Sequence, residues 1–249
     1  MNVTLDLAAL ESVKADLRSA LPKIPSTQRI EAFARGAGFN AYAAMRAALR
    51  DGPVRVVPHD EAFERYLSDH DLHANDRALR RTLARVGLRR AMAHDSMLTT
   101  TGYGIAWQLY KTNAEARAAS VQLRADLLDD WSADQFELAS LYLSQLEPRK
   151  SLNRDYSTYN LKHQAERLSR ERGIATHLGN YVCNGVFIAA ALSAGFHVRQ
   201  IDWSSLNGFI NATTRSIKAA RTGQLINRST MSALWRLVTA PDPEVSEAA

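Results

Sequence analysis

An apolar segment in the C-terminal part of the chain constrains the fold more than any other feature of the sequence. Between residues 181 and 194 polar side chains are few, with Asn184 and Ser193 among them. The longest largely apolar run, from Gly185 to Phe196, is too short to span a bilayer, which takes about 20 residues. We therefore expect a helix buried in the core of a soluble protein, with no membrane partner.

The single cysteine, Cys183, lies at the start of this segment beside Tyr181, Val182, Val186 and Phe187. A lone cysteine excludes an internal disulfide, and its apolar neighbours predict a buried structural thiol, not a nucleophile. The N-terminal stretch carries acidic residues where a signal peptide would carry its basic region. We therefore expect a reducing, cytoplasmic location.

Composition and periodicity predict a mainly α-helical, bundle-like protein with one or two short β-strand pairs. The 249 residues are 46% hydrophobic and 23% charged, and glycine (12) and proline (7) are scarce. Apolar spacing and capping signals predict helices at 5–21, 28–36, 41–50, 60–70, 76–92, 114–129, 133–145, 158–173, 181–194 and 229–240. Short strands are expected at 54–57, 198–201 and 209–213.

Several local details accompany these helices. Trp107 and Tyr110 are assigned to a further aromatic helix, and Trp131 to the core. A capping box formed by Ser132 and Gln135 is expected to begin the helix at 133–145. The dipeptides Gly38-Phe39 and Gly195-Phe196 predict helix endings in which glycine takes the left-handed conformation and the apolar residue folds back.

Positive charge is concentrated in the C-terminal part of the chain. From Pro148 to Ala240 there are 13 Lys and Arg against 4 Asp and Glu, a net charge of +9, whereas residues 1–147 carry −1 and residues 241–249 carry −3. This change predicts a helical N-terminal domain (1–147), a basic helical C-terminal domain (148–240) and a disordered acidic tail (241–249). The shared helical character leaves a single continuous domain open.

The candidate functional segment lies between Pro148 and Gly173, where cations alternate with hydroxyl, amide and aromatic side chains. Guanidinium and ammonium groups supply charge for phosphates, hydroxyls and amides supply positioned hydrogen bonds, and tyrosines can stack on bases. Ser157 is expected to cap the helix at 158–173. The candidate nucleic-acid-binding residues are Arg149, Lys150, Arg154, Tyr156, Tyr159, Lys162, His163, Arg167, Arg170, Arg215, Lys218 and Arg221.

We therefore predict a protein that binds DNA or RNA through the nucleic-acid backbone, with DNA favoured and no metal or other cofactor. Two other interpretations stay open: a basic surface that is merely solvated, and a non-catalytic assembly protein that binds an acidic partner. The protein could also form a homo-oligomer. A further alternative is an enzyme acting on a phosphate-bearing substrate, with Tyr159, Lys162 and His163 near the chemistry. The sequence contains no G-x-S-x-G, H-E-x-x-H, C-x-x-C, Walker or kinase motif, which favours a binding protein.

Two clusters in the N-terminal half allow more than one interpretation. Arg77, Arg81 and Arg85 share one helix face. Such a stripe is compatible with phosphate binding, with lying on a membrane surface and equally with internal ion pairs. His70 and His73 lie among aspartates, yet a capping-rich loop is favoured over a metal site because a third distant ligand is missing.

Two segments resemble known proteins. The pattern PRKSLNR…SxYxLKHxAE…YxxNGxxIAAALxxGF, from Pro148 to Phe196, is similar to uncharacterised proteins of proteobacterial plasmids and integrative elements. This resemblance implies a plasmid or mobile-element context and brings no established activity. The helix–turn–helix pair from Ile30 to Leu49 resembles a short helical module found beside glyoxalase-superfamily proteins, and we interpret it as a packing unit, not a DNA-binding motif.

Overall fold

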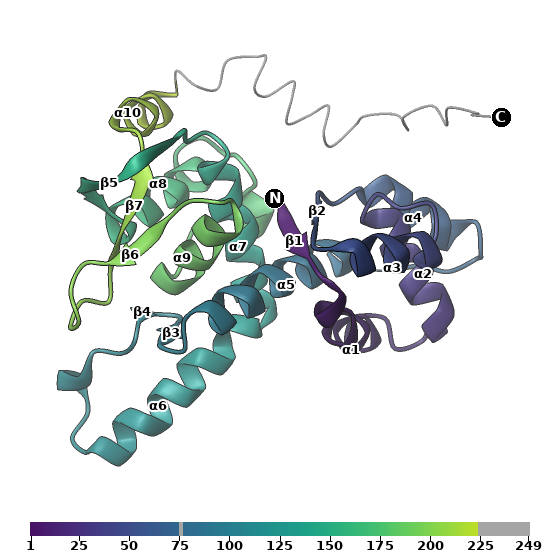
Figure 1. Ribbon diagram of the computed structural model, residues 1–249, viewed down its shortest axis with the longest axis horizontal. Helices are drawn as coiled ribbons and strands as arrows, with labels where there is room; N and C mark the ends of the chain where they lie inside the picture. The colour runs from purple at the N-terminus through teal and green to yellow at the C-terminus, as the bar shows by residue number, and fades with distance from the viewer. Residues whose placement is uncertain (75–76, 224–249) are drawn as a thin grey trace.

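The computed structural model describes residues 1–74 and 77–223, which fold mainly into α-helices (Figure 1). Their strands form antiparallel sheets of only two or three strands, so the expected mainly α class with short β pairs is confirmed. The helices are α1 (Leu10–Ala20), α2 (Ser26–Gly36), α3 (Tyr42–Asp51), α4 (Asp60–Ser68), α5 (Ala78–His94), α6 (Asn113–Ala125), α7 (Asp130–Leu143), α8 (Thr158–Arg170), α9 (Asn184–Ser193) and α10 (Thr214–Thr222). The strands are β1 (Val3–Leu5), β2 (Val54–Val56), β3 (Leu98–Thr99), β4 (Gly102–Tyr103), β5 (Pro148–Ser157), β6 (Val198–Gln200) and β7 (Gly208–Ala212).

The helix predicted at 229–240 and the tail predicted at 241–249 lie outside the described residues. Across the part of the chain that the structure does describe, every helix is too short or too polar to cross a bilayer.

The N-terminal helices α1, α3 and α4 pack against α2, and the two-stranded sheet β1–β2 lies beside them, next to α5 (Figure 1). The predicted helix at 5–21 is wrong at its start, because Val3 and Leu5 are fully buried as strand residues and Val3 pairs with Val56. Asp6 then accepts a hydrogen bond from the backbone N–H of Ala9 at 2.9 Å and begins the helical path. A strand of three residues is too short to show a clear alternation in sequence.

Both predicted glycine–phenylalanine helix endings are confirmed. Gly38 and Gly195 have φ angles of 88° and 91°. The N–H of Phe39 donates to the carbonyl of Ala34 at 2.9 Å, and Phe196 makes the matching bond at the end of α9. These left-handed glycines satisfy the last carbonyls of each helix.

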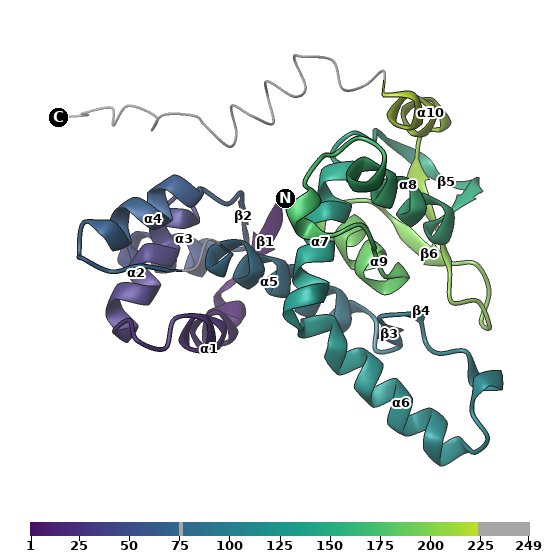
Figure 2. The same ribbon diagram turned by 180° about the vertical axis from the view of Figure 1, so that it is seen from behind.

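Helix α5 runs between the N-terminal helices and the C-terminal part of the molecule (Figures 1 and 2). It packs against α1 and β1 on one side and against α7 and α9 on the other. At Gly87 the absent side chain makes room for α7, since a Cβ there would lie 2.5 Å from Cζ of Phe136. Helix α5 therefore ties the two halves of the molecule together.

Helix α9 is the centre of the C-terminal half, and the buried apolar helix predicted at 181–194 is confirmed from Asn184 onward. Eight successive residues, Asn184 to Ala191, are buried. A Cβ at Gly185 would lie 1.7 Å from the backbone oxygen of Thr99, so the backbone of β3 packs directly against α9 at this glycine. Cys183 is buried as expected, and this burial raises the pKa of its thiol to about 11.

A three-stranded sheet in the order β5–β7–β6 covers this region. The strands expected at 198–201 and 209–213 form the antiparallel pair β6–β7, in which Val198 lies opposite Ile210. Strand β5 was not anticipated, because its residues are polar on both faces and it lies at the sheet edge. Its one buried residue, Asn153, donates from Nδ2 to the carbonyl of Ala212 at 3.0 Å.

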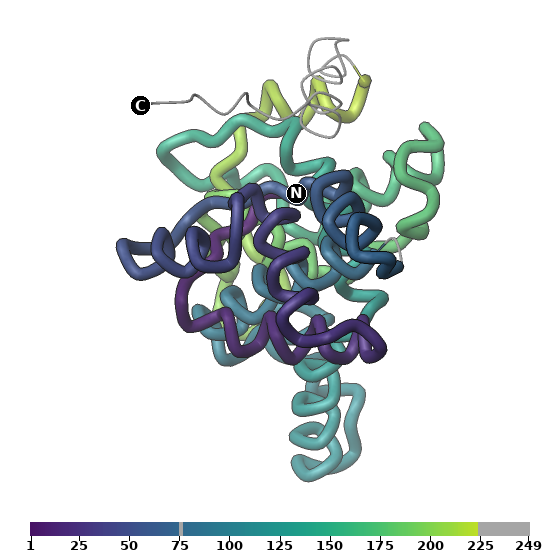
Figure 3. The backbone as a smooth tube through the Cα atoms, turned by 90° about the vertical axis from the view of Figure 1, so that its right-hand side faces the viewer, coloured from purple at the N-terminus to yellow at the C-terminus, as the bar shows by residue number. Residues whose placement is uncertain are grey.

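Helix α6 and the segment before it project from the rest of the molecule (Figure 3). Ala116 is the one buried residue of α6. The aromatic helix expected around Trp107 and Tyr110 is wrong, since one short 3-10 turn, η2 (Trp107–Leu109), stands there. Trp107 is half exposed and Leu109 is exposed, so a longer helix here would have little apolar surface to bury against the protein.

Helix α7 begins earlier than the sequence indicated. Its N-cap is Asp129, which accepts a hydrogen bond from the N–H of Ser132 at 2.6 Å, so the predicted capping box starting at Ser132 is wrong. Helix α7 packs against α9 and α8 across the proposed boundary at Pro148. The division into domains 1–147 and 148–240 stays a prediction that proteolysis can test.

Candidate nucleic-acid interface

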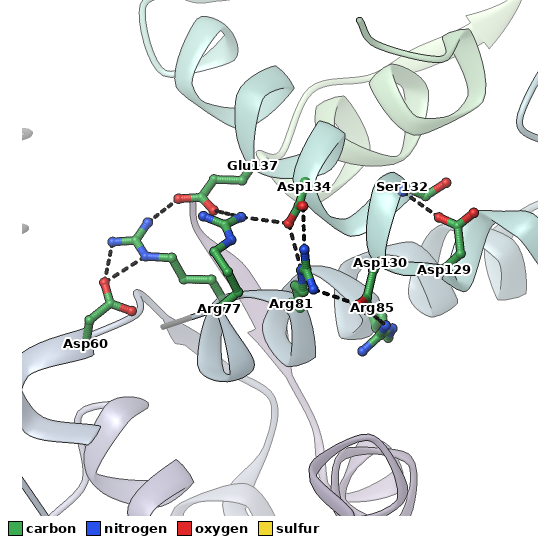
Figure 4. A network of polar contacts seen from close by, with 10 residues as sticks. Asp60, Arg77, Arg81, Arg85, Asp129, Asp130, Ser132, Asp134 and Glu137 are labelled. Carbon is green, nitrogen blue, oxygen red and sulfur yellow. Dashed lines mark hydrogen bonds and ion pairs between the residues drawn. The ribbon is translucent and has the colours of Figure 1, made fainter. Parts of the chain in front are cut away.

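The arginine face of α5 pairs with carboxylates of neighbouring helices (Figure 4). Arg77 donates to Asp134 at 2.8 Å and to Glu137 at 2.9 Å, and Arg81 binds Asp134 at 2.8 Å. Arg85 pairs with Asp130. Of the interpretations left open for these arginines, the structure shows internal ion pairing.

Charge in this network is mutually compensated. Burial opposes a charge on the Asp134 carboxyl, but hydrogen bonds from Arg81 and Arg77 outweigh it and lower the pKa of Asp134. Arg80 joins the network through Asp60 and Glu137. These cations are occupied in holding α5 to α4 and α7.

The cations of β5 and α10 are different. They are exposed, and within residues 1–74 and 77–223 none of them forms an ion pair with a carboxylate. We call these side chains, together with the exposed arginines of α8, the basic surface. Its members are Arg149, Lys150, Arg154, Arg167, Arg170, Arg215, Lys218 and Arg221.

Helix α10 presents its three cations on one stripe. Thr213 caps the helix by accepting from the N–H of Ser216 at 3.1 Å, which fixes where the helix begins. Arg215, Lys218 and Arg221 then recur at every third residue and face solvent, while Ser216, Ile217 and Ala220 are buried. This periodicity places all three positive charges on the outer side of the helix.

Hydrogen bonds place α10 beside β5 and α8. Asn153 Nδ2 of β5 donates to Thr214 Oγ1 at 3.0 Å. Arg172, just after α8, donates from Nη2 to the carbonyl oxygens of Ala220 at 3.0 Å and Arg221 at 2.6 Å. The three elements that carry the basic surface are therefore contiguous, as Figure 1 also shows.

Helix α8 begins as predicted. Ser157 accepts a hydrogen bond from the N–H of Asn160, and the Asn160 side chain accepts one from the N–H of Ser157, which completes a capping box. Arg167 and Arg170 are exposed, and their contacts with Glu171 (3.4 Å) and Glu166 (3.7 Å) are long. Because both arginines are exposed and these contacts are long, the pairs contribute little stability and both guanidiniums stay accessible.

Lys162 is not part of the basic surface, so its assignment to a nucleic-acid contact is wrong. The residue is 3% exposed, and Nζ donates to Glu166 Oε1 at 2.9 Å. Its ammonium also lies 5.0 Å from the ring centre of Tyr159 and 4.9 Å from that of Tyr181. A cation held by a buried carboxylate and two rings has no free side for a phosphate.

Glu166 collects several donors around one buried carboxylate. Besides Lys162, it accepts from the N–H of Val182 at 3.1 Å and contacts Nδ1 of His163 at 2.7 Å. Burial disfavours the charged form, but these hydrogen bonds outweigh it and lower the pKa of Glu166. The carboxylate thus joins α8 to the segment that leads into α9.

A hollow of about 490 Å³ opens between the end of β5, α8 and α10. Four predicted residues lie on its wall, namely Tyr156, His163, Arg167 and Arg221. Asp155, Asn160 and Gln164 complete the lining, so one carboxylate faces the same space as two guanidiniums. The remaining members of the basic surface lie outside the hollow.

The ring contacts around Lys162 include two residues that the sequence did not indicate. Trp131, expected in the core, is 54% exposed and stacks on Tyr181 with ring centres 5.5 Å apart and planes 4° apart. Phe136 and Tyr142, on the same helix, are buried. Because Trp131 and Tyr181 are 50 residues apart, no local spacing could have linked them.

The histidines at 70 and 73 gain no support as metal ligands. His70 Nδ1 lies 2.8 Å from the carbonyl oxygen of Tyr66, and the two rings pack together. Among the described residues, no three His, Cys, Asp or Glu side chains gather as a metal-binding group would require.

Comparisons with protein-family models, curated proteins and solved structures gave no match to this chain.

Proposed function

We propose that this protein binds nucleic acid, DNA in the first place, through contacts between the basic surface and the phosphate backbone. The observation that carries the proposal is the contrast between two sets of cations. The arginines of α5 are neutralised by carboxylates, whereas those of β5 and α10 have no carboxylate partner in the described residues. Uncompensated cations on contiguous elements create a positive field that attracts a polyanion.

The chemistry of the hollow supports the same proposal. Arg167 and Arg221 offer guanidinium donors, which suit phosphate oxygens, and Tyr156 and Asn160 add neutral hydrogen-bonding groups. Asp155 reduces the local positive potential, so a phosphate there depends on both arginines. Backbone contacts of this kind position a nucleic acid without reading its sequence.

The direct test is binding at low ionic strength, followed by fluorescence anisotropy. A labelled duplex of random sequence and a labelled oligothymidylate serve as probes, and polyglutamate serves as competitor. We expect binding that salt weakens, because each neutralised phosphate releases condensed counterions. Competition by polyglutamate at equal charge concentration, with no preference for nucleic acid, would instead support the acidic-protein alternative.

One arrangement favours a second candidate, an enzyme acting on a phosphate-bearing substrate. His163 lines the hollow and contacts the buried Glu166 carboxylate through Nδ1, an orientation that suits acid–base chemistry at the other ring nitrogen. The test is a screen of generic nuclease and phosphatase substrates with the wild type and His163→Ala. Hydrolysis that disappears in the variant would establish the enzyme, and an inactive wild type would dismiss it.

A further inference from the structure

A row of ring contacts leads away from the hollow. His163, on the wall of the hollow, meets the ring of Tyr159 edge-on at 4.7 Å. The Lys162 ammonium lies over both the Tyr159 ring and the Tyr181 ring, 5.0 Å and 4.9 Å from their centres. Trp131, on helix α7, stacks on Tyr181 and is the last residue of the row.

The rings of this row are held in place and yet open to solvent. Tyr159, Tyr181 and Trp131 are 49%, 46% and 54% exposed, respectively. Trp131 and Tyr181 stack on one another and Tyr159 packs on His163, yet about half of each of these three residues stays uncovered. Exposed apolar surface of this kind is typical of a binding site when it is contiguous.

The support beneath the row is rigid. Lys162 is anchored by the buried Glu166 carboxylate, which also accepts the N–H of Val182. The position of the ammonium over two rings adds a cation–π attraction to each of them. Rings that are already ordered lose little conformational entropy when a flat partner stacks on them.

We infer that this aromatic row, formed by Tyr159, Tyr181 and Trp131, stacks the bases of single-stranded nucleic acid. The inference rests on the proposed function and names its preferred partner. Arg167 and Arg221 lie where His163 joins the row to the hollow, so phosphates of the same strand find cations beside the rings. In a duplex the bases stack on one another and are unavailable, so the row selects unpaired strands.

Trp131→Ala tests the inference, with Trp203→Ala as a matched control. Trp203 is 93% exposed and takes part in none of the ring contacts of the row. We expect Trp131→Ala to raise the dissociation constant for an oligothymidylate of about 15 nucleotides at least about fivefold, the lower end of base–aromatic stacking, and to leave duplex binding unchanged. Trp203→Ala changes neither, and melting curves confirm that both variants are folded.

Fluorescence supplies an independent measurement. Stacking of a base on Trp131 quenches its indole emission, so oligothymidylate quenching is expected to fall in Trp131→Phe and to persist in Trp203→Phe. The stacking inference is overturned if Trp131→Ala binds oligothymidylate as tightly as the wild type, or if it loses the same affinity for duplex and for single strand. In either case the proposed function still stands as long as the wild-type protein binds nucleic acid in a salt-dependent way. A wild-type protein that binds neither probe overturns both.

Discussion

Lys162 and Glu166 form an ion pair that is almost fully removed from solvent, since each side chain is 4% exposed. Burying both charges is costly, but their hydrogen bond and the N–H of Val182 compensate for the lost hydration. Breaking such a pair from one side leaves the other charge uncompensated. The pair is therefore a structural element of α8, not a spare cation of the surface.

We predict that Lys162→Met destabilises the protein by about 3 kcal/mol, measured by urea unfolding, because the Glu166 carboxylate loses its buried cation. The carboxylate keeps only one backbone N–H and its contacts with His163 and, at 3.7 Å, with the exposed Arg170. Lys150→Met, an equivalent change at an exposed position of β5, is expected to alter stability by less than about 0.5 kcal/mol. Equal stabilities for the two variants would contradict the burial of Lys162.

Acid should weaken the fold in part through Glu166. Its pKa is lowered in the folded state from the ordinary value of 4.5, so its contribution is fully present above that pH and is lost as pH falls through the folded value. Glu166→Gln is less stable than the wild type at neutral pH, and we expect this difference to shrink steadily below about pH 4.5. A difference that stays constant down to pH 3 would show that Glu166 is not held ionised by its partners.

At the scale of elements, two glycines set how closely neighbouring segments approach a helix: β3 approaches α9 at Gly185, and α7 approaches α5 at Gly87. A Cβ at Gly185 would meet the backbone oxygen of Thr99, whereas one at Gly87 would meet the ring of Phe136. A ring can move aside, but a backbone carbonyl packed on a helix moves only with its whole segment. The two positions should therefore respond differently to the same substitution.

Gly185→Ala is expected to destabilise the protein by about 3 kcal/mol or more, and Gly87→Ala by about 1–2 kcal/mol, in chemical denaturation. Helix propensity alone would make both alanines stabilising, by roughly 1 kcal/mol. Stabilisation of either variant would show that the packing seen at that glycine is not tight.

Some of these elements could be predicted from the sequence and others could not. Helix α8 could be predicted because its start is signalled locally by Ser157 and its apolar residues recur with helical spacing. Strand β5 could not, because nearly all of its residues are polar or exposed and show no apolar alternation. Its pairing, in which Asn153 lies opposite Ile210, depends on residues far along the chain. The spacing of Lys162 and Glu166 was visible, but their burial depends on the distant Tyr181 and Val182.

The candidate site divides in the same way. The excess of positive charge after Pro148 was visible in the sequence, but which of its cations are exposed was not, because Lys162 belongs to the same segment and is buried. Pairing of the α5 arginines was only one of several alternatives, since Asp130 and Asp134 lie on another helix. The stacking of Trp131 on Tyr181 was not predictable, because it joins residues from two helical regions that only the tertiary fold brings together.

At the scale of the whole molecule, Pro148 lies between helices that pack on one another. Helix α7 contacts α8 and α9, and β5 pairs with β7 immediately after Pro148. We expect limited trypsin digestion to spare residues 146–156 and thermal unfolding to show one transition. Early release of a fragment that begins there, together with two transitions, would establish the boundary predicted from charge.

The measurement that tests the central claim most directly is the salt dependence of duplex binding by Lys150→Ala/Arg154→Ala. If these residues of β5 neutralise phosphates, the variant binds every sequence more weakly, and the log–log salt slope falls in magnitude by about 1 for each phosphate that is no longer neutralised. Arg18→Ala/Lys23→Ala removes the same charge from exposed positions of the N-terminal half and is expected to keep the wild-type slope. A slope that is unchanged in the β5 variant, or reduced equally in both, would contradict the assignment of the basic surface to nucleic acid.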